Sequence, residues 1–187
     1  MEQTYAEYEE FLVEVVIEVD VECKMKDVES SYQSALGMVK KIYECEQKLD
    51  DDEKEWEERL SIYSNYLNIE FEEGRNPAHI QNLYERRIKD HCLHPHVWTT
   101  YIDYIDLTLK SESDSLSVCQ RAIRNVPNSG AVWIKYIRAL ERYRKPKELV
   151  LSVIEKALSR NLMEGVTKYR ELWLAYIDYK RRSLIKV

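Results

Sequence analysis

The sequence is poor in glycine and proline, with four residues of each among 187, and it contains only two phenylalanines. Scarce glycine and proline argue against a turn-rich β protein, and a charged fraction of 33% suits helices with solvated faces. No C-x-x-C motif occurs, and the four cysteines lie far apart, which indicates reduced intracellular thiols. The composition therefore predicts an all-α protein inside the cell.

Long apolar runs are also missing. The nearest candidate, residues 11–19, is interrupted by Glu14 and Glu18, is too short to span a bilayer and follows acidic residues rather than a basic leader. The net charge of −6 argues against nonspecific nucleic-acid binding, which needs a basic surface. We therefore expect a soluble protein with no membrane contact and no direct RNA binding by this segment.

Aromatic residues, in contrast, are abundant and periodic. Tyr63, Trp98 and Trp133 are 35 residues apart, and each is followed three positions later by a tyrosine. A second register with the same period runs through residues 84–88, 119–123 and 154–158. Two registers with one period predict a repeat of two helices, A and B, because such units are about 34 residues long. Arrays of this kind are scaffolds that bind partners along an extended surface.

Prolines support the predicted helix boundaries, since none falls inside an apolar register. Asn76 is placed as an N-cap with Pro77 as the first helical residue, and Pro95 opens the next helix A. The remaining expected boundaries are a turn at residues 110–114, a separator at residues 127–130, and Pro146 opening a helix B.

The last interval is longer, because Trp133 and Trp173 are 40 residues apart. We expect the five extra residues to form a loop between Arg160 and Lys168. Residues 169–187 then hold a helix A without its helix B, which leaves an apolar face open. Residues 55–187 are predicted to hold three repeats plus the first helix of another, as part of a longer array.

The first 54 residues fit the repeat less well. Residues 1–20 have aromatic residues at helical spacing, and residues 27–49 carry one broad apolar stripe, so helices are expected in both. The acidic run at residues 50–58 complements the positive end of the following helix. As an alternative it contacts a basic partner. Residues 1–54 are thus predicted to be degenerate repeats.

Rings spaced three apart lie on one face of helix A, where burial stabilises the array by about 2–3 kcal/mol for each large side chain. The alternative is an exposed aromatic strip that stacks nucleic-acid bases. In helix B, small residues allow close helix approach. The predicted repeat-packing residues are Tyr63, Tyr66, Tyr84, Trp98, Tyr101, Ala122, Trp133, Tyr136, Ala157, Trp173 and Tyr176.

Arg87 occupies the position of Ala122 and Ala157 in the first unit. An unpaired guanidinium is costly to bury, so we expect Arg87 to extend outward along its aliphatic stem. On that hypothesis Arg87→Ala is nearly neutral for stability.

Two clusters could carry other functions. Residues 91–96 hold three histidines and one cysteine, but their spacing fits a turn better than a zinc site. The basic residues Arg138, Arg142, Arg144 and Lys145 surround one A–B turn, either as a solvated turn or as a contact for RNA or an acidic partner. No nucleophile elbow, phosphate-binding loop or H-E-x-x-H motif occurs. We expect no metal, no cofactor and no enzymatic activity.

W-x-x-Y in helix A, followed by a helix B ending in a segment like Y-E-R-A-I and a proline, resembles the half-a-TPR (HAT) repeat. The matching segments are residues 80–88, 121–127, 131–136 and 171–179. Departures are Tyr63 for tryptophan, Arg87 for alanine and Cys119 for an aromatic residue.

The resemblance implies a right-handed superhelical solenoid of antiparallel helix pairs in a nuclear RNA-processing factor, most similar to spliceosomal recycling factors of the Prp24-like type. It further implies small nuclear ribonucleoprotein components and ubiquitin-specific proteases as partners, and self-association of the array. A purely structural spacer or a dimerisation segment is a further alternative.

Overall fold

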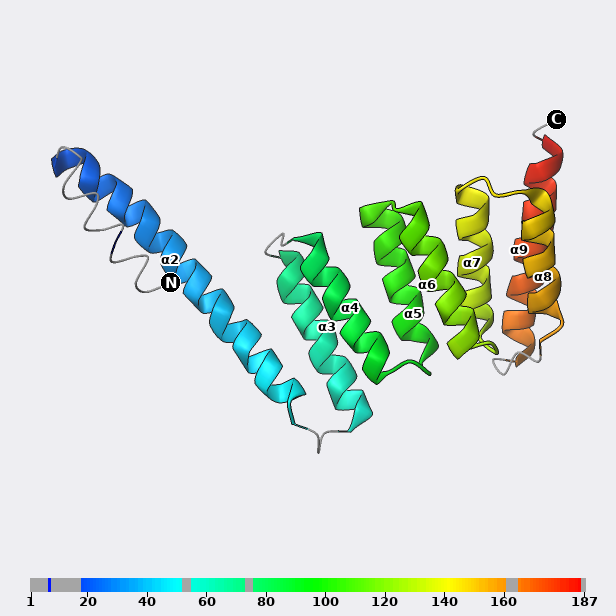
Figure 1. The fold of residues 1–187 in the computed structure, drawn as a ribbon, viewed down its shortest axis with the longest axis horizontal. Helices are drawn as coiled ribbons and strands as arrows, with labels where there is room; N and C mark the ends of the chain where they lie inside the picture. Colours follow the sequence, from blue (N-terminus) through cyan, green and yellow to red (C-terminus); the bar gives the residue numbers. More distant parts are fainter. Residues whose placement is uncertain (1–6, 8–17, 52–54, 73–75, 161–164, 186–187) are drawn as a thin grey trace. The chain divides into compact units, whose positions relative to one another are not determined.

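The computed structural model describes residues 7, 18–51, 55–72, 76–160 and 165–185. The chain divides into two compact units, residues 1–75 and 76–187. Helices make up nearly all of the described chain, which contains no strand, so the all-α prediction is confirmed (Figure 1). No helix in the described ranges is both long and apolar enough to cross a membrane.

The first unit contains helices α2 (Glu18–Leu49) and α3 (Trp56–Glu72). They pack together near the end of α2, where Cys45 and Leu49 are buried and the Arg59 guanidinium donates to the Leu49 carbonyl at 2.9 Å. The helix predicted at residues 27–49 is confirmed, although its apolar stripe is only partly covered, because Tyr43 is 62% exposed. The helix predicted at residues 1–20 lies mostly outside the described residues.

The second unit contains the remaining helices in chain order. They are α4 (Pro77–Asp90), α5 (Pro95–Tyr104), the π-helical turn η1 (Ile105–Leu109), α6 (Glu112–Asn125), α7 (Gly130–Arg142), α8 (Lys147–Leu158) and α9 (Gly165–Ile185).

Short polar caps and prolines set these boundaries largely as the sequence predicts. The Asn76 side chain accepts from the Ala78 N–H at 3.0 Å, and Pro77 and Pro95 are first helical residues. The turn predicted at residues 110–114 is too long, because Ser111 caps α6 by accepting from the Asp114 N–H and the helix has already begun at Glu112. Lys110, with φ 53°, turns the chain before that cap.

The A helices α5, α7 and α9 form one layer, in which α7 contacts both others, while α6 and α8 pack against α7 from the B side. Trp98 and Trp133 are buried, and each indole N–H donates to a carbonyl six residues earlier, in the preceding B-to-A loop, at 2.7 and 2.8 Å. Ala122 and Ala157 are fully buried, as expected where helices approach closely. The indole bond therefore fixes each helix A to the loop before it.

Other predicted packing residues behave similarly. Tyr84 of α4 stacks on Tyr101 and Tyr104 of α5, with ring centroids 4.8 and 5.3 Å apart. Tyr63, Tyr66 and Tyr136 are also buried. The contact of Tyr84 with the next helix A is what a stacked array requires, and it leaves these rings no free face for nucleic-acid bases.

Helix α9 differs from the other A helices at its start. It begins eight residues before Trp173, whereas α5 and α7 begin three residues before Trp98 and Trp133. The five extra residues, predicted as a loop, therefore mainly lengthen α9. The carbonyl that accepts the indole N–H of Trp98 or Trp133 lies six residues earlier, in a loop. The equivalent position before Trp173 is residue 167, which lies inside α9 and therefore offers no loop carbonyl. Trp173 is 43% exposed and Tyr176 is half-buried.

Arg87 is buried, with only 3% of its surface exposed, so the expectation that it extends outward was wrong. Its Nη1 donates to the Thr100 hydroxyl of α5 at 3.5 Å, and burial lowers the pKa of the guanidinium. Residue 87, which corresponds to Ala122 and Ala157 of the later repeats, is therefore still a packing position, and the aliphatic part of the Arg87 side chain fills it.

The burial of Arg87 leads to a prediction opposite to the one from sequence. Arg87→Ala should lower the free energy of unfolding by about 2 kcal/mol, because it leaves a void where the stem packed. Arg87→Met, which keeps the volume and removes the buried charge, should be neutral or stabilising. Urea denaturation of both variants checks this, and an Arg87→Ala protein as stable as the wild type would contradict it.

Candidate partner-binding surface

A groove of about 410 Å³ runs between the A helices α7 and α9. Each helix contributes positions i, i+3, i+4 and i+7, which lie on one helical face. Relative to the repeat tryptophan, these are the same four positions in both helices. The lining residues are Ala131, Ile134, Lys135 and Arg138 from α7, and Glu171, Leu174, Ala175 and Asp178 from α9.

The two walls of the groove carry opposite charges. Lys135 and Arg138 make the α7 wall basic, while Glu171 and Asp178 make the α9 wall acidic. Lys135 also pairs with Asp103 and Asp178 with Arg181, so these two charges are partly balanced within the chain. Leu174 is 53% exposed, so the groove also presents aliphatic surface. An apolar surface between a basic and an acidic wall fixes both the position and the direction of a segment with complementary charges.

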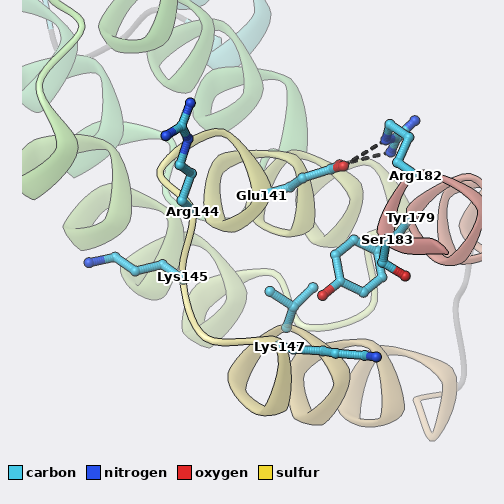
Figure 2. Close-up of a pocket in the computed structure, with 8 residues that line it drawn as sticks. Glu141, Arg144, Lys145, Lys147, Tyr179, Arg182 and Ser183 are labelled. Carbon is cyan, nitrogen blue, oxygen red and sulfur yellow. Dashed lines mark hydrogen bonds and ion pairs between the residues drawn. The ribbon is translucent and has the colours of Figure 1, made fainter. Parts of the chain in front are cut away.

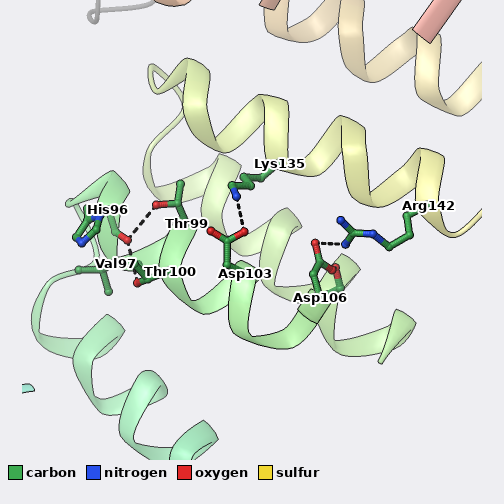
Figure 3. Close-up of polar contacts among 9 residues, drawn as sticks. His96, Val97, Thr99, Thr100, Asp103, Asp106, Lys135 and Arg142 are labelled. Atoms are coloured by element: carbon green, nitrogen blue, oxygen red, sulfur yellow. Dashed lines mark hydrogen bonds and ion pairs between the residues drawn. The ribbon is translucent and has the colours of Figure 1, made fainter. Parts of the chain in front are cut away.

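One repeat earlier, the same helical positions carry polar side chains that are engaged within the chain. The positions on α5 are His96, Thr99, Thr100 and Asp103, and both threonine hydroxyls donate to the His96 carbonyl, at 3.1 and 3.0 Å (Figure 3). Lys135 of α7 reaches across to form an ion pair with Asp103. Lys135 thus lines the groove between α7 and α9 and also contacts the preceding helix A.

A second ion pair lies deeper between the same two repeats. Arg142, at the end of α7, pairs with Asp106 of η1, whose carboxylate also accepts from the buried Ser115 hydroxyl at 2.7 Å (Figure 3). Only 4% of the Asp106 side chain is exposed. The hydrogen bond to Asp106 raises the pKa of Arg142.

The four basic residues singled out from sequence thus separate into two kinds. Arg142 pairs with Asp106 and Lys145 pairs with Glu112, so both hold neighbouring repeats together. Arg138 and Arg144 are exposed, and neither makes an ion pair within the described part of the chain. Only these two are available for a partner without breaking a contact between repeats.

The B helices are joined by a similar pair. Arg121 of α6 donates two hydrogen bonds to the Glu85 carboxylate of α4, at 2.8 and 2.6 Å, and its guanidinium lies over the Trp98 ring, 5.6 Å from the centroid. The hydrogen bonds from Arg121 lower the pKa of Glu85. A carboxyl with a lowered pKa stabilises the fold above its unfolded pKa and loses this contribution as the pH falls through its folded pKa.

Glu85→Gln should therefore flatten the acid limb of the stability profile below about pH 5. The expected difference is under about 1 kcal/mol, because more than a third of this carboxyl is exposed to solvent. Melting temperatures from pH 3 to 7 measure it, with Glu155→Gln on the exposed face of α8 as the control. Parallel profiles for Glu85→Gln and the wild type would show that the pair contributes nothing.

The histidine-rich turn forms no metal site in the described ranges, where no three His, Cys, Asp or Glu side chains are grouped to hold an ion. His91 is buried, and its ring meets His94 edge-on at a centroid distance of 6.0 Å. These residues shape the turn that precedes α5.

Most of the residues predicted to pack are buried, but the predicted packing residue Trp173 is 43% exposed, and the groove was not predicted from the sequence. A signal was present, since the four lining positions have the same offsets from Trp133 and Trp173, and three of the four in each helix are polar or small. It could be used only once the A helices were known to lie side by side.

The chain is similar in sequence to proteins of a known repeat family. A model of the PRP39 N-terminal HAT repeat matches residues 40–184. The chain is 38% identical over 184 residues to spliceosome associated factor 3, U4/U6 recycling protein, of Mus musculus, and 37% identical to that of Homo sapiens. Each match covers 98% of this chain and 18% of the relative. The Caenorhabditis elegans relative is 23% identical over 161 residues, which is 86% of this chain and 18% of its own length.

Proposed function

The chain belongs to the family of PRP39-type N-terminal HAT repeats, as its sequence pattern predicted, and from that membership we propose that it is a non-catalytic protein-interaction scaffold in pre-mRNA splicing. Matches at 37–38% identity over 98% of this chain, to proteins named as U4/U6 recycling factors, are the observation that carries the proposal. A nuclear location follows from the same role. Because the chain spans only 18% of these relatives, it supplies one part of their activity.

We propose that the scaffold binds protein components of the small nuclear ribonucleoproteins through the groove between α7 and α9. Support comes from the oppositely charged walls, which suit a segment carrying acidic residues on one side and basic residues on the other. RNA contact through the basic turn is the alternative. The use of Arg142 and Lys145 in internal ion pairs argues against it.

Binding of the chain to purified U4/U6 ribonucleoprotein and to its deproteinised RNA separates these two functions. A protein scaffold should bind the particle and should not bind the naked RNA. Equal affinity for the naked RNA, falling steeply with salt, would instead support the RNA-contacting array.

Recruitment of ubiquitin-specific proteases is a finer proposal that rests on the family resemblance alone. Calorimetric titration with the N-terminal domain of such a protease tests it directly. Binding near micromolar would support docking on this segment, and an absence of heat would move that role to other parts of the relatives.

We also propose that residues 55–187 form three repeats and the first helix of a fourth, after degenerate repeats in residues 1–54. Support for a continuing array comes from α9, on which Tyr169, Trp173 and Ile177 form an exposed apolar face. Packing of a following helix B would cover this face. The same face would serve self-association, which sedimentation at increasing concentration would detect.

A further inference from the structure

A second cavity, of about 320 Å³, lies where α7 ends, α8 begins and the last turns of α9 pass (Figure 2). It is distinct from the groove between the A helices and shares no lining residue with it. The lining residues are Glu141, Arg144, Lys145, Lys147, Val150, Tyr179, Arg182 and Ser183.

Four of these residues are basic, and two of the four already have partners. Arg182 donates to both Glu141 oxygens, at 2.6 and 2.8 Å, and Lys145 pairs with Glu112. Arg144 and Lys147 are exposed and form no ion pair within the described residues. The cavity therefore carries positive charge that the chain itself does not neutralise.

Comparison with the preceding repeat shows which group is missing. The pair of Glu141 and Arg182 repeats the pair of Asp106 and Arg142, at offsets of 35 and 40 residues. In the earlier repeat Glu112 supplies a further carboxylate, which Lys145 binds. Thirty-five residues after Glu112 the chain has Lys147 instead. The later site has thus lost a carboxylate and gained a cation at the same position.

Tyr179 adds a polar group that points into the cavity. Only 7% of this residue is exposed, yet it lines the cavity, and its hydroxyl makes no hydrogen bond within the described part of the chain (Figure 2). Burial, with Glu141 and Glu148 nearby, raises the pKa of Tyr179, so the hydroxyl stays protonated and can donate. A hydroxyl that lines the cavity and has no acceptor within the described part of the chain is free to donate to a ligand there.

We propose that this cavity binds a carboxylate side chain of an acidic peptide segment in a partner protein, held by Lys147 and the Tyr179 hydroxyl, with Arg144 adding positive charge at the rim. The incoming carboxylate takes the place that Glu112 fills one repeat earlier. This inference concerns a second surface and stands whether or not the partner is a spliceosomal protein.

The surroundings favour a peptide over a nucleic acid. Glu112, Glu141 and Glu148 border the basic residues, so the positive charge is confined to one cavity. A nucleic-acid backbone follows a groove lined with successive positive charges, and flanking carboxylates would repel its neighbouring phosphates. A single acidic side chain meets no such repulsion.

Fluorescence anisotropy of the whole chain with a labelled hexaglutamate peptide tests the proposal, with hexaglutamine and a ten-nucleotide uridine RNA as comparison probes. Hexaglutamate should bind and hexaglutamine should not. Lys147→Glu, which restores the residue type of the earlier repeat, should weaken binding by about tenfold or more. Lys156→Glu, the same change on the last turn of α8, should leave it unchanged.

Arg144→Gly provides an independent variant. Arg144 has φ 51°, a conformation that glycine adopts without strain, so this substitution removes a charge without harming the fold. Its affinity for hexaglutamate should fall roughly threefold to tenfold. The proposal is overturned if hexaglutamate binds no better than hexaglutamine, if Lys147→Glu has no effect, or if the RNA binds more tightly through Lys147.

Discussion

Trp133→Ala is expected to lower the free energy of unfolding by about 3–5 kcal/mol. The ring is 97% buried between neighbouring repeats, and its indole N–H donates to the Pro127 carbonyl at 2.8 Å. Truncation removes a large apolar surface and leaves the Pro127 carbonyl without this donor. Urea denaturation followed by circular dichroism measures the loss.

Trp173→Ala is the matched control, because it makes the same change at the same repeat position. Trp173 is 43% exposed, so the expected loss is under about 1 kcal/mol. Equal losses of unfolding free energy for Trp133→Ala and Trp173→Ala would contradict the conclusion that Trp133 is buried between repeats whereas Trp173 of α9 is exposed. If a following repeat covers α9, the cost at Trp173 should rise in a longer chain that contains it.

Asp106→Ala is expected to cost about 2–4 kcal/mol. Its carboxylate is almost fully buried, accepts from the fully buried Ser115 hydroxyl and pairs with Arg142 of the next repeat. Without Asp106, the Ser115 hydroxyl loses its acceptor where water has no access. Arg142 is half-exposed and regains water, which limits the loss.

Asp103→Ala is the comparison for this prediction. Asp103 also pairs with a basic residue of α7, Lys135, but 44% of its side chain is exposed. An exposed pair contributes little, so the expected loss is under about 1 kcal/mol. Thermal unfolding of the two variants at the same pH measures the difference, and similar melting temperatures would show that burial of Asp106 has no special role.

The helix positions could be predicted because the packing residues repeat. An aromatic residue every 35 residues, at positions 63, 98 and 133, marks successive A helices, and alanines at 122 and 157 mark the close contacts of helix B. Asn76, Pro77 and Pro95 give the helix starts, since caps act through local backbone groups. These signals lie within one element or one period.

Other features depend on contacts that no local pattern contains. Arg87 is buried although isolated guanidinium groups avoid the interior, because Thr100 of the next helix A lies within reach of its Nη1. The extra residues before Trp173 lengthen α9, because an insertion between two helices can extend one of the helices instead of the loop between them. The cavity beside α8 depends on Arg182 returning to Glu141 across 41 residues. An ion pair between residues so far apart in the sequence can be identified only from the folded structure.

The groove between α7 and α9 is central to the proposed scaffold function, and a titration of purified U4/U6 ribonucleoprotein with two arginine variants tests it most directly. Arg138 is exposed on the basic wall, and Arg124 is exposed on α6 outside the groove. Arg138→Glu should weaken binding of the particle by about tenfold, whereas Arg124→Glu should leave it unchanged. Equal affinities for the wild type and Arg138→Glu would contradict docking in this groove.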